Sequence, residues 1–347
     1  MSGHDIIVVG ASVGGVEALT QLAKGLPADI PAAIFVVLHV PTTGTSAMPR
    51  ILERAGNLKA FHPQDGDAIE PGKIYIAPPN YHLLLKRGYV RLVQGPRENG
   101  HRPAIDPLFR TAARAYGRRV VGVILSGTLD DGSAGLLVVK HSGGKAIVQS
   151  PDDALFAGMP QNAINRVEVD RILPLSEIPD ALVQLAHEPV PDEPNGSVPR
   201  TVEFESDTVE IDMDASEKAN GDRPGKPSGF GCPSCGGALW EMNEGQFLRF
   251  RCRIGHAWSE DSLLAEQNEA IEEALWVALK SLEERAALTM RMADRARDRQ
   301  QNRMVARYEE DANELKQHAE TIRRILLKDP VKEPPNGDLP DRKSTLG

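Results

Sequence analysis

The sequence predicts an α/β fold whose sheet is doubly wound and mostly parallel, and three observations support this prediction. Short apolar runs bounded by turn residues recur along the first half of the chain, as expected of strands buried on both faces. Segments with apolar residues at three- and four-residue spacing lie between these runs, as expected of crossover helices. Reactive polar residues follow directly after three of the runs, at the edge where open parallel sheets form ligand crevices.

The first predicted strand and helix enclose a serine. Residues 6–9 are continuously apolar, and a helix pattern follows Gly14 and Gly15, with Val16, Ala18, Leu19, Leu22 and Ala23. Ser12 therefore lies in the turn, where the backbone N–H groups of Val13, Gly14 and Gly15 point toward any negative charge beside it. The segment G-A-S-V-G fits the G-x-S-x-G pattern of a nucleophile elbow. A dinucleotide-binding turn is the alternative, but its G-x-G-x-x-G pattern needs glycine at position 12.

Composition limits the class of protein. The 347 residues are enough for two domains, and 41% hydrophobic with 5% aromatic residues is ordinary globular content. The formal net charge of −9 argues against nonspecific nucleic-acid binding. No segment resembles a signal peptide, and the longest apolar runs are far shorter than the ~20 residues of a membrane span. We therefore expect a cytoplasmic protein without direct membrane insertion.

A histidine and a pair of aspartates follow two further predicted strands. His39 comes directly after the apolar run at residues 33–38, and Asp130 and Asp131 follow the run at residues 120–125. Ser12, His39 and one of the two aspartates would then meet at one sheet edge, as the nucleophile, base and orienting carboxylate of a serine hydrolase do. A structural loop histidine and a helix N-cap aspartate are the alternatives.

The remaining predicted elements complete the α/β domain near residue 190. A hairpin of residues 83–85 and 89–93, with short strands near 73–77, is expected as an insertion covering one side of the sheet. Helices are expected near residues 46–54, after Asp106-Pro107, after Gly158 and near residues 178–186, and a further strand at residues 145–149.

Five segments of the first half occur in this order: G-A-S-V-G-G-V-E-A-L, V-L-H-V-P, H-R-P-A-I-D-P-L-F, L-S-G-T-L-D-D-G-S-A-G and G-G-K-A-I-V-Q-S-P-D-D-A-L-F-A-G-M-P-Q-N-A-I. Together they resemble the catalytic domain of the CheB-type chemotaxis protein-glutamate methylesterases, over about residues 4–188. The resemblance implies a triad of Ser12, His39 and Asp131, because the family's aspartate immediately precedes a glycine, here Gly132. It also implies hydrolysis of glutamyl methyl esters on chemoreceptors without a cofactor and, in some members, deamidation of receptor glutamines.

Three departures from the family pattern bear on activity and regulation. Val13 stands where the family usually has threonine, which removes a hydroxyl near the oxyanion although the backbone N–H remains. The segment Ser126-Gly127-Thr128-Leu129 replaces the usual T-G-M-G. The typical enzyme also has an N-terminal phospho-receiver domain, whereas this sequence begins at the catalytic strand, so we expect no regulation by a receiver in cis.

Composition changes after residue 190. Residues 191–229 are rich in Pro, Gly, Ser, Asp and Glu and contain too few apolar residues for a core, which predicts an acidic disordered linker. Within it, residues 202–211 could still pair locally as an edge strand.

Cys232, Cys235, Cys252 and His256 predict a structural zinc site. They occur as C-P-S-C-G-G and C-R-I-G-H and include all three cysteines of the chain, which is a metal pattern rather than a disulfide framework. Three thiolates and one imidazole form the closed, four-coordinate set of structural zinc. We expect a zinc-ribbon-like module over residues 230–258, distant from Ser12, with a small core of Trp240, Phe247, Phe250 and Trp258.

Residues 259–329 predict a helical hairpin. Apolar residues recur at helical spacing from Leu264 to Met292 and from Tyr308 to Leu326, with the polar stretch 294–303 between them. A continuous coiled coil is the alternative, because no Gly or Pro interrupts residues 260–329. Such apolar stripes usually form a plain core, although these could also support self-association. Residues 330–347 predict a disordered tail.

Two classes of function remain open. One is an esterase that acts on methylated chemoreceptors or related signalling proteins, with the zinc module and helices serving docking or assembly. The other is a noncatalytic signalling scaffold that keeps the α/β fold for binding. The presence of Ser12, His39 and Asp131 favours the esterase.

Overall fold

The computed structural model describes residues 3–190, 200–210, 225–244 and 247–327. The chain divides into two units between Glu266 and Gln267, and each is described by itself. The predicted tail at residues 330–347 and most of the predicted linker lie outside the described residues.

Seven strands of the first unit form one sheet in the order β3-β4-β2-β1-β7-β8-β9. Every pairing between neighbours is parallel. Side chains alternate along the central strand, with Ile6 and Val8 in the core on one face and Ile7 and Val9 in the core on the other. The strands are β1 (Ile6–Ala11), β2 (Ala33–Leu38), β3 (Lys59–Phe61), β4 (Lys73–Ile76), β7 (Val120–Ile124), β8 (Lys145–Gln149) and β9 (Arg171–Leu173).

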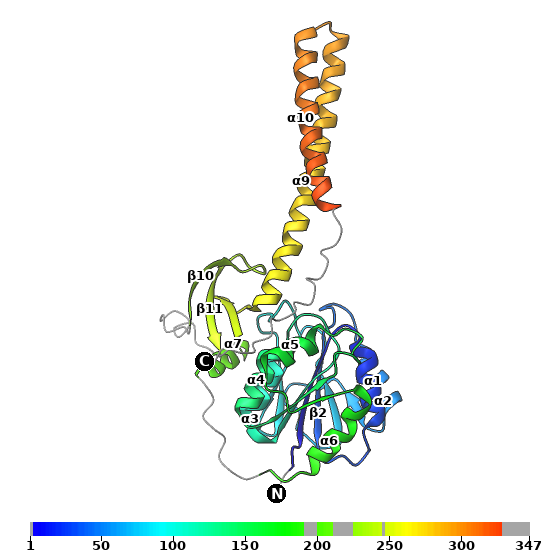
Figure 1. Cartoon of the computed structure of the whole chain (residues 1–347), viewed down its shortest axis with the longest axis vertical. Helices are drawn as coiled ribbons and strands as arrows, with labels where there is room; N and C mark the ends of the chain where they lie inside the picture. The colour runs from blue at the N-terminus through cyan, green and yellow to red at the C-terminus, as the bar shows by residue number, and fades with distance from the viewer. Residues whose placement is uncertain (1–2, 191–199, 211–224, 245–246, 328–347) are drawn as a thin grey trace, which may run out of the picture. The chain divides into compact units, whose positions relative to one another are not determined.

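Helices cover both faces of this sheet, which confirms the doubly wound prediction (Figure 1). One face packs against α1 (Gly15–Gly25), α2 (Met48–Ala55) and α6 (Ile178–His187). The other packs against α3 (Ile105–Tyr116), α4 (Ser133–His141) and α5 (Gly158–Arg166). The predicted hairpin, β5 (His82–Lys86) and β6 (Tyr89–Val93), is an insertion that packs on this second face. Two short 3-10 turns lie at Gly117–Arg119 and Leu175–Glu177.

The strand order brings three distant chain segments to one edge of the sheet. Strand β1 lies between β2 and β7, so the chain proceeds from β1 to β2 on one side and returns to β7 on the other. Because the three strands are parallel, Ser12, His39 and Asp131 all follow carboxyl ends at the same edge. This is the switch point where open α/β sheets bind ligands.

Helix α7 (Arg200–Glu210) occupies part of the segment predicted to be a disordered linker. The expectation of an edge strand within residues 202–211 is wrong, because residues 202–210 are helical. Val209 packs against Leu84 and Val93 of the β5–β6 hairpin, so this polar segment has one buried face that its composition did not reveal.

A four-stranded antiparallel sheet, here called the ribbon, follows α7 in the order β10-β11-β12-β13. Its core contains Phe250 and Trp258, as expected, together with Leu239 and Leu263. Trp240 is only partly buried, and Phe247 joins the core of the α/β domain instead, because the start of β12 packs against that domain. The strands are β10 (Lys226–Gly231), β11 (Ala238–Glu244), β12 (Phe247–Cys252) and β13 (Ala257–Ser259).

Five buried charged residues, here called the charge cluster, join the ribbon, α7 and the α/β domain. Glu205 of α7 contacts Arg249 at 2.7 Å and Arg251 at 2.9 Å, both on β12. Arg251 also contacts Glu98 at 2.9 Å, and Glu98 contacts Arg110 of α3 at 2.8 Å. All five are at most 3% exposed. Because a buried charge is tolerated only with partners, the cluster ties the three segments into one unit.

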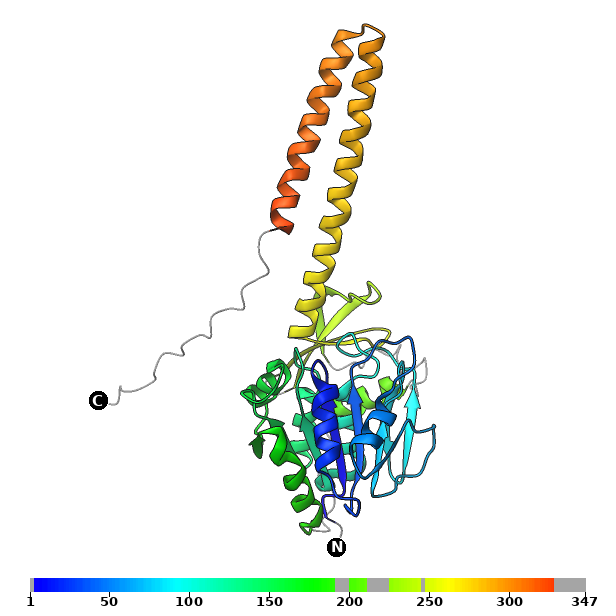
Figure 2. The same cartoon turned by 90° about the vertical axis from the view of Figure 1, so that its right-hand side faces the viewer.

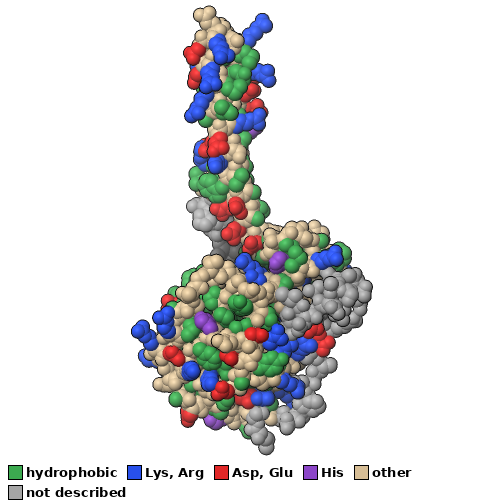
Figure 3. All heavy atoms as spheres, turned by 180° about the vertical axis from the view of Figure 1, so that it is seen from behind, with side chains coloured by type: hydrophobic (Ala, Val, Ile, Leu, Met, Phe, Trp, Pro, Cys, Tyr) green, Lys and Arg blue, Asp and Glu red, His purple; other side chains and the backbone are tan. Residues whose placement is uncertain are grey.

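Helices α9 (Glu260–Asp298) and α10 (Asn302–Leu326) lie antiparallel and form the predicted hairpin (Figure 2). The turn falls in the polar stretch 294–303, so the continuous coiled-coil alternative is wrong. The exposed surface of the hairpin carries acidic, basic and hydrophobic side chains interspersed (Figure 3). No helix of the described residues has an apolar stretch sufficient to cross a bilayer. The buried seam consists mainly of small residues: Leu279, Ala286, Ala293, Ala296, Ala312 and Ala319.

Candidate active site

Ser12 lies in the turn between β1 and α1, as predicted. Its N–H donates to the carbonyl of Ser126 at 3.0 Å, and its own carbonyl accepts the N–H of Gly15 at 2.8 Å. Gly14 has a φ of 76°, a left-handed conformation that glycine adopts without strain. The Gly15 N–H thus holds the turn, and no hydrogen bond among the described residues uses the N–H of Val13 or Gly14.

A hydrogen-bonded array joins Ser12, His39 and Asp131. His39 Nδ1 lies 3.1 Å from Ser12 Oγ, and His39 Nε2 lies 2.7 Å from Asp131 Oδ2. An ionised carboxylate only accepts, so Nε2–H donates to Asp131 and the lone pair of Nδ1 faces the Ser12 hydroxyl. The array can therefore move the serine proton to His39 while Asp131 stabilises the resulting imidazolium.

Asp131 accepts several further hydrogen bonds. Its oxygens receive the N–H of Ile105 at 2.7 Å, the N–H of Asp106 at 3.3 Å and the side-chain amide of Asn99 at 2.9 Å. Burial alone would raise the pKa of Asp131, but the contact with His39 and the hydrogen bond from the Ile105 N–H hold it well below its usual range. The carboxylate therefore stays ionised and keeps His39 in one orientation.

Asn99 and His101 contact this array, and neither was among the predicted catalytic, oxyanion or metal-binding residues. The ring of His101 stacks on His39 with centroids 3.6 Å apart and planes 14° apart. Burial, with help from the neighbouring His39, lowers the pKa of His101 to about 4, so His101 is neutral near pH 7. The dipeptide Asn99-Gly100 was the available sequence signal, since it is typical of tight turns.

Asp106 is a second buried carboxyl beside Asp131. Its Oδ1 accepts the N–H of Gly135 at 2.7 Å, and its Oδ2 lies 3.3 Å from the amide nitrogen of Asn99. Burial and the charge of Asp131 raise the pKa of Asp106 to about 7, although Arg249 opposes this shift. Asp106 therefore changes protonation near neutral pH, whereas Asp131 does not.

Asp130 faces away from the array. Its carboxylate contacts Arg166 at 2.5 Å and accepts the hydroxyl of Ser259 at 2.6 Å and that of Ser262 at 3.3 Å. Burial raises its pKa above the usual range. The geometry therefore supports Asp131, rather than Asp130, as the carboxylate that orients His39.

Two of the three departures from the family pattern, at Val13 and Leu129, place apolar side chains on the surface. Val13 is 45% exposed, and Leu129 has a φ of 59° where the family usually has glycine. A non-glycine residue in this left-handed region costs about 1–2 kcal/mol. Val13 directly follows Ser12 and Leu155 lies beside Gly14, so these exposed side chains give the turn an apolar surface.

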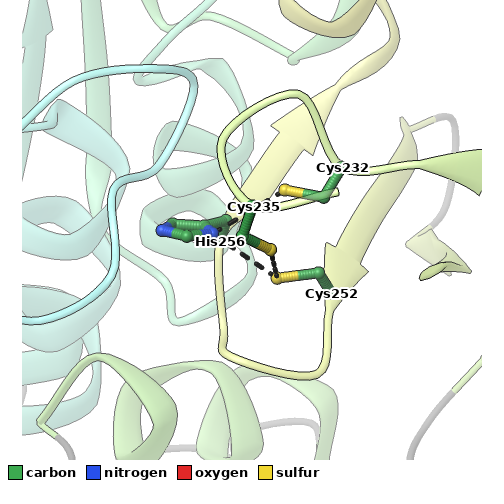
Figure 4. A group of neighbouring side chains, drawn as sticks. All are labelled: Cys232, Cys235, Cys252 and His256. Atoms are coloured by element: carbon green, nitrogen blue, oxygen red, sulfur yellow. Dashed lines mark hydrogen bonds between the residues drawn. The ribbon is translucent and has the colours of Figure 1, made fainter. Parts of the chain in front are cut away.

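Cys232, Cys235, Cys252 and His256 converge in the ribbon (Figure 4). Cys235 Sγ lies 3.7 Å from Cys252 Sγ, and His256 Nδ1 lies 3.7 Å from Cys232 Sγ and 3.6 Å from Cys252 Sγ. Tetrahedral zinc with sulfur ligands at about 2.3 Å separates two of them by roughly 3.8 Å. The four predicted ligands therefore fit a four-coordinate metal ion in both chemistry and spacing.

The fold and the array define a class: an α/β protein with a serine-hydrolase type of Ser–His–Asp array at its switch point. The chain belongs to the CheB methylesterase family, whose model matches residues 7–182.

Similar proteins support this membership. The chain is 44% identical over 184 residues to "Protein-glutamate methylesterase/protein-glutamine glutaminase 5" of Anaeromyxobacter dehalogenans, covering 52% of this chain and 51% of that protein. It is 38% identical over 183 residues to a putative protein of the same name from Leptospira interrogans, covering 95% of that protein. The crystal structure of the Thermotoga maritima CheB methylesterase catalytic domain matches with a TM-score of 0.51 and 34% identity, over 53% of this chain and 100% of that one. The chain thus matches about half the length of the first of these relatives.

Proposed function

We propose that the chain is a protein-glutamate methylesterase that hydrolyses glutamyl methyl esters of chemoreceptors or related signalling proteins. The observation that carries this proposal is the partly buried array in which His39 bridges Ser12 Oγ and Asp131. Family membership supplies the substrate class, because relatives that share this half of the chain are named for that reaction. The ionised Asp131 and the neutral His101 suit a histidine that must become cationic during the reaction.

The proposed reaction has two steps. Ser12 Oγ attacks the ester carbonyl while His39 Nδ1 takes its proton, and the Val13 and Gly14 N–H groups face the developing oxyanion. Methanol leaves with the proton from His39, which produces an acyl-enzyme. Water then attacks the acyl carbon with His39 again as base, and release of the glutamate carboxylate restores Ser12. No cofactor takes part in these steps.

Deamidation of glutamine side chains is a second proposed activity. It follows the same steps with ammonia as the leaving group, and the matched relatives carry "protein-glutamine glutaminase" in their names. A noncatalytic scaffold is the less favoured alternative, since His39 contacts both Ser12 Oγ and Asp131 as the hydrolysis requires.

The test of this proposal is methanol release from a methyl-esterified chemoreceptor fragment by the full chain. We expect Ser12→Ala to lower kcat at least about 10⁴-fold without changing the fold, because the nucleophile is lost. Ser142→Ala is the control and should retain activity, because Ser142 lies between α4 and the amino end of β8, at the opposite edge of the sheet. Equal methanol release by Ser12→Ala and the unaltered chain would exclude Ser12 as the nucleophile.

We also propose that the ribbon binds one structural zinc ion through Cys232, Cys235, Cys252 and His256. A set of three thiolates and one imidazole leaves no open position for a substrate, so the metal would supply folding free energy to the ribbon. Metal analysis of the purified chain should find about one zinc per chain, and Cys235→Ser should abolish stoichiometric binding. Full zinc retention by this variant would contradict the ligand set.

We further propose that the protein is cytoplasmic and that it self-associates through the hairpin. The three cysteines form one ligand cluster rather than disulfides, which suits the reducing cytoplasm. The hairpin offers exposed apolar side chains for self-association, including Ile271, Val277 and Leu288. Sedimentation of the chain at increasing concentration tests this, since a constant monomer mass would exclude it.

A further inference from the structure

A four-residue turn lies between the catalytic array and the ribbon. In the turn Glu98–His101, the N–H of each end residue donates to the carbonyl of the other, at 3.2 and 2.9 Å. Its central residues, Asn99 and Gly100, have φ values of 50° and 78°. Two successive positive φ values are typical of the type I′ turn, for which Asn-Gly is the preferred sequence. Asn99 and His101 therefore occupy fixed positions in a tight turn.

One side of this turn contacts the array. The Asn99 amide donates to Asp131 Oδ1 at 2.9 Å, and the His101 ring stacks on His39. The turn thus touches two of the three residues that the proposed hydrolysis uses. Asn99 is 5% exposed, so water does not readily replace its amide as a donor to Asp131.

The other side of the turn pairs with the ribbon. The N–H of Ala257 donates to Arg97 O at 3.2 Å, and the N–H of Asn99 donates to Ala257 O at 2.8 Å, forming a parallel bridge beside β13. The N–H of Ser259 donates to Asn99 Oδ1 at 2.9 Å. The two ends of the Asn99 amide are therefore held separately: the ribbon holds the oxygen, and the nitrogen points at Asp131.

Strand β13 is attached directly to the proposed metal ligands. It begins at Ala257, the residue after His256, and pairs with β12, which ends at Cys252. The N–H of Cys252 donates to His256 O at 3.0 Å. A metal that links Cys252 to His256 would therefore fix the β12–β13 connection, and with it the strand that holds Asn99.

We propose that the ribbon is a support of the catalytic array, in which β13 fixes Asn99 and Asn99 positions Asp131. Asn99 is a positioning residue: it touches neither substrate nor the attacking oxygen, and it acts through Asp131 on His39. The ribbon is thus required for the full hydrolysis rate, in contrast to the expectation that its metal site is remote from catalysis. This inference rests on the proposed function.

The first experiment replaces Asn99 by glycine, which keeps the positive φ accessible but removes the amide. A small displacement of a catalytic group costs on the order of 10²-fold in rate, so kcat of Asn99→Gly should fall by about that factor while KM changes little. Asn80→Gly is the matched control: Asn80 also has a positive φ, of 66°, but bonds only Arg102 among the described side chains. Equal kcat values for the two variants would overturn the proposal.

A second variant, Asn99→Asp, separates positioning from a general structural role. It keeps an oxygen for the Ser259 N–H but places a carboxyl group against Asp131. The titratable and charged groups that face the His39–Asp131 pair are His101 and Asp106, with Arg249 beyond Asp106. Two carboxyl groups at this separation cannot both ionise, so the pair holds a proton at low pH and loses it, with repulsion, as pH rises. The ratio of kcat for Asn99→Asp to kcat for the unaltered chain should therefore fall with rising pH, and a ratio that stays constant would contradict the proposed contact.

The third experiment removes the metal from the full chain with a chelator and follows hydrogen exchange beside kcat. We expect the amides of Asn99 and Ser259 to lose protection together with kcat, and added zinc to restore both. Loss of protection confined to residues 226–256, with kcat and the Asn99 amide unchanged, would overturn the proposal. If the unaltered chain hydrolyses no ester, the proposed function fails, and the exchange of the Asn99 amide still decides whether the ribbon supports the turn.

Discussion

Asp130 and Asp131 are consecutive residues whose carboxylates have different surroundings. Asp131 accepts from His39, while Asp130 is bound by Arg166 and by Ser259. Both are buried, at 2% and 3% exposure, so burial does not distinguish them. Their hydrogen-bond partners distinguish them, so substitution of each aspartate should have a different effect on the hydrolysis rate and on stability.

Asp131→Asn should lower kcat by about 10⁴-fold, because an amide can hold His39 in the wrong tautomer and cannot stabilise its cation. Asp130→Asn should leave kcat within about threefold and instead lower stability, since it weakens the contact with Arg166. Steady-state hydrolysis and urea unfolding of both variants check this pair of expectations. The reverse ranking of kcat would assign the orienting role to Asp130.

Asp106 makes stability depend on pH. Its folded pKa of about 7 lies above the ordinary value of 3.8, so the folded state binds a proton more tightly than the unfolded state does. The stability that Asp106 contributes is then present below about pH 4 and is lost as pH rises toward 7. Asp131 has the opposite shift, and its contribution is lost as pH falls below its ordinary range.

Asp106→Asn should remove the Asp106 part of this dependence, because the amide cannot ionise yet can still accept the N–H of Gly135. The free energy of unfolding of Asp106→Asn, relative to the unaltered chain, should therefore rise between pH 4 and 7, by at most about 1.4 kcal/mol per pH unit. Urea titrations at several pH values measure the difference. A difference that stays constant over this interval would show that Asp106 does not titrate there.

Strand ends made three of the site residues predictable. Ser12, His39 and the pair Asp130-Asp131 each follow an apolar run, and parallel strands bring such positions to one edge of the sheet. The choice of Asp131 over Asp130 came from the resemblance to the family, whose aspartate precedes a glycine. Asn99 and His101 were not predictable in the same way, because they follow the β5–β6 insertion, whose placement on the sheet is a tertiary property. The Asn99-Gly100 pair signals a turn but not what the turn touches.

Helices and strands, like single residues, were predictable only where they leave a local pattern in the sequence. The doubly wound sheet and the helical hairpin followed from periodicity, but β3 and β9 have three residues each, too few for a periodic signal. Helix α7 was missed because its sequence is polar and acidic. Its Glu205 becomes a core residue only where Arg249 and Arg251 meet it, and a pairing over that distance leaves no local pattern.

Glu205→Gln should destabilise the first unit by about 3 kcal/mol, because it leaves three buried guanidinium groups with less compensating charge. The neighbouring guanidinium groups outweigh the cost of burial and lower the pKa of Glu205 to about 2, so it is ionised at neutral pH. Glu203→Gln on the exposed face of α7 is the matched control and should change stability by less than about 0.5 kcal/mol. Comparable midpoints of urea unfolding for the two variants would contradict a structural role of the charge cluster.

The two units differ in what stabilises them. The first has two large cores on either side of a parallel sheet and the charge cluster. The second, as far as the structure describes it, is a pair of helices with a seam of mostly alanine. Small side chains bury little apolar area, so the hairpin gains much less from packing per residue.

Heating should therefore unfold the chain in two transitions, with the hairpin first. Chelation should lower the midpoint of the transition that belongs to the first unit and leave the other in place, because the proposed metal ligands all precede residue 267. Calorimetry with and without chelator measures both midpoints. One cooperative transition, shifted as a whole by chelation, would show that the units do not unfold independently.

The charge cluster limits where the chain can be truncated without exposing buried charged residues. The family model matches residues 7–182, but the first folded unit extends to Glu266. Truncation of the chain after residue 182 would remove Glu205, Arg249 and Arg251. Glu98 and Arg110, which are buried in the full chain, would then be exposed to water. The part of the first unit that follows residue 182 is thus an integral part of its folded structure.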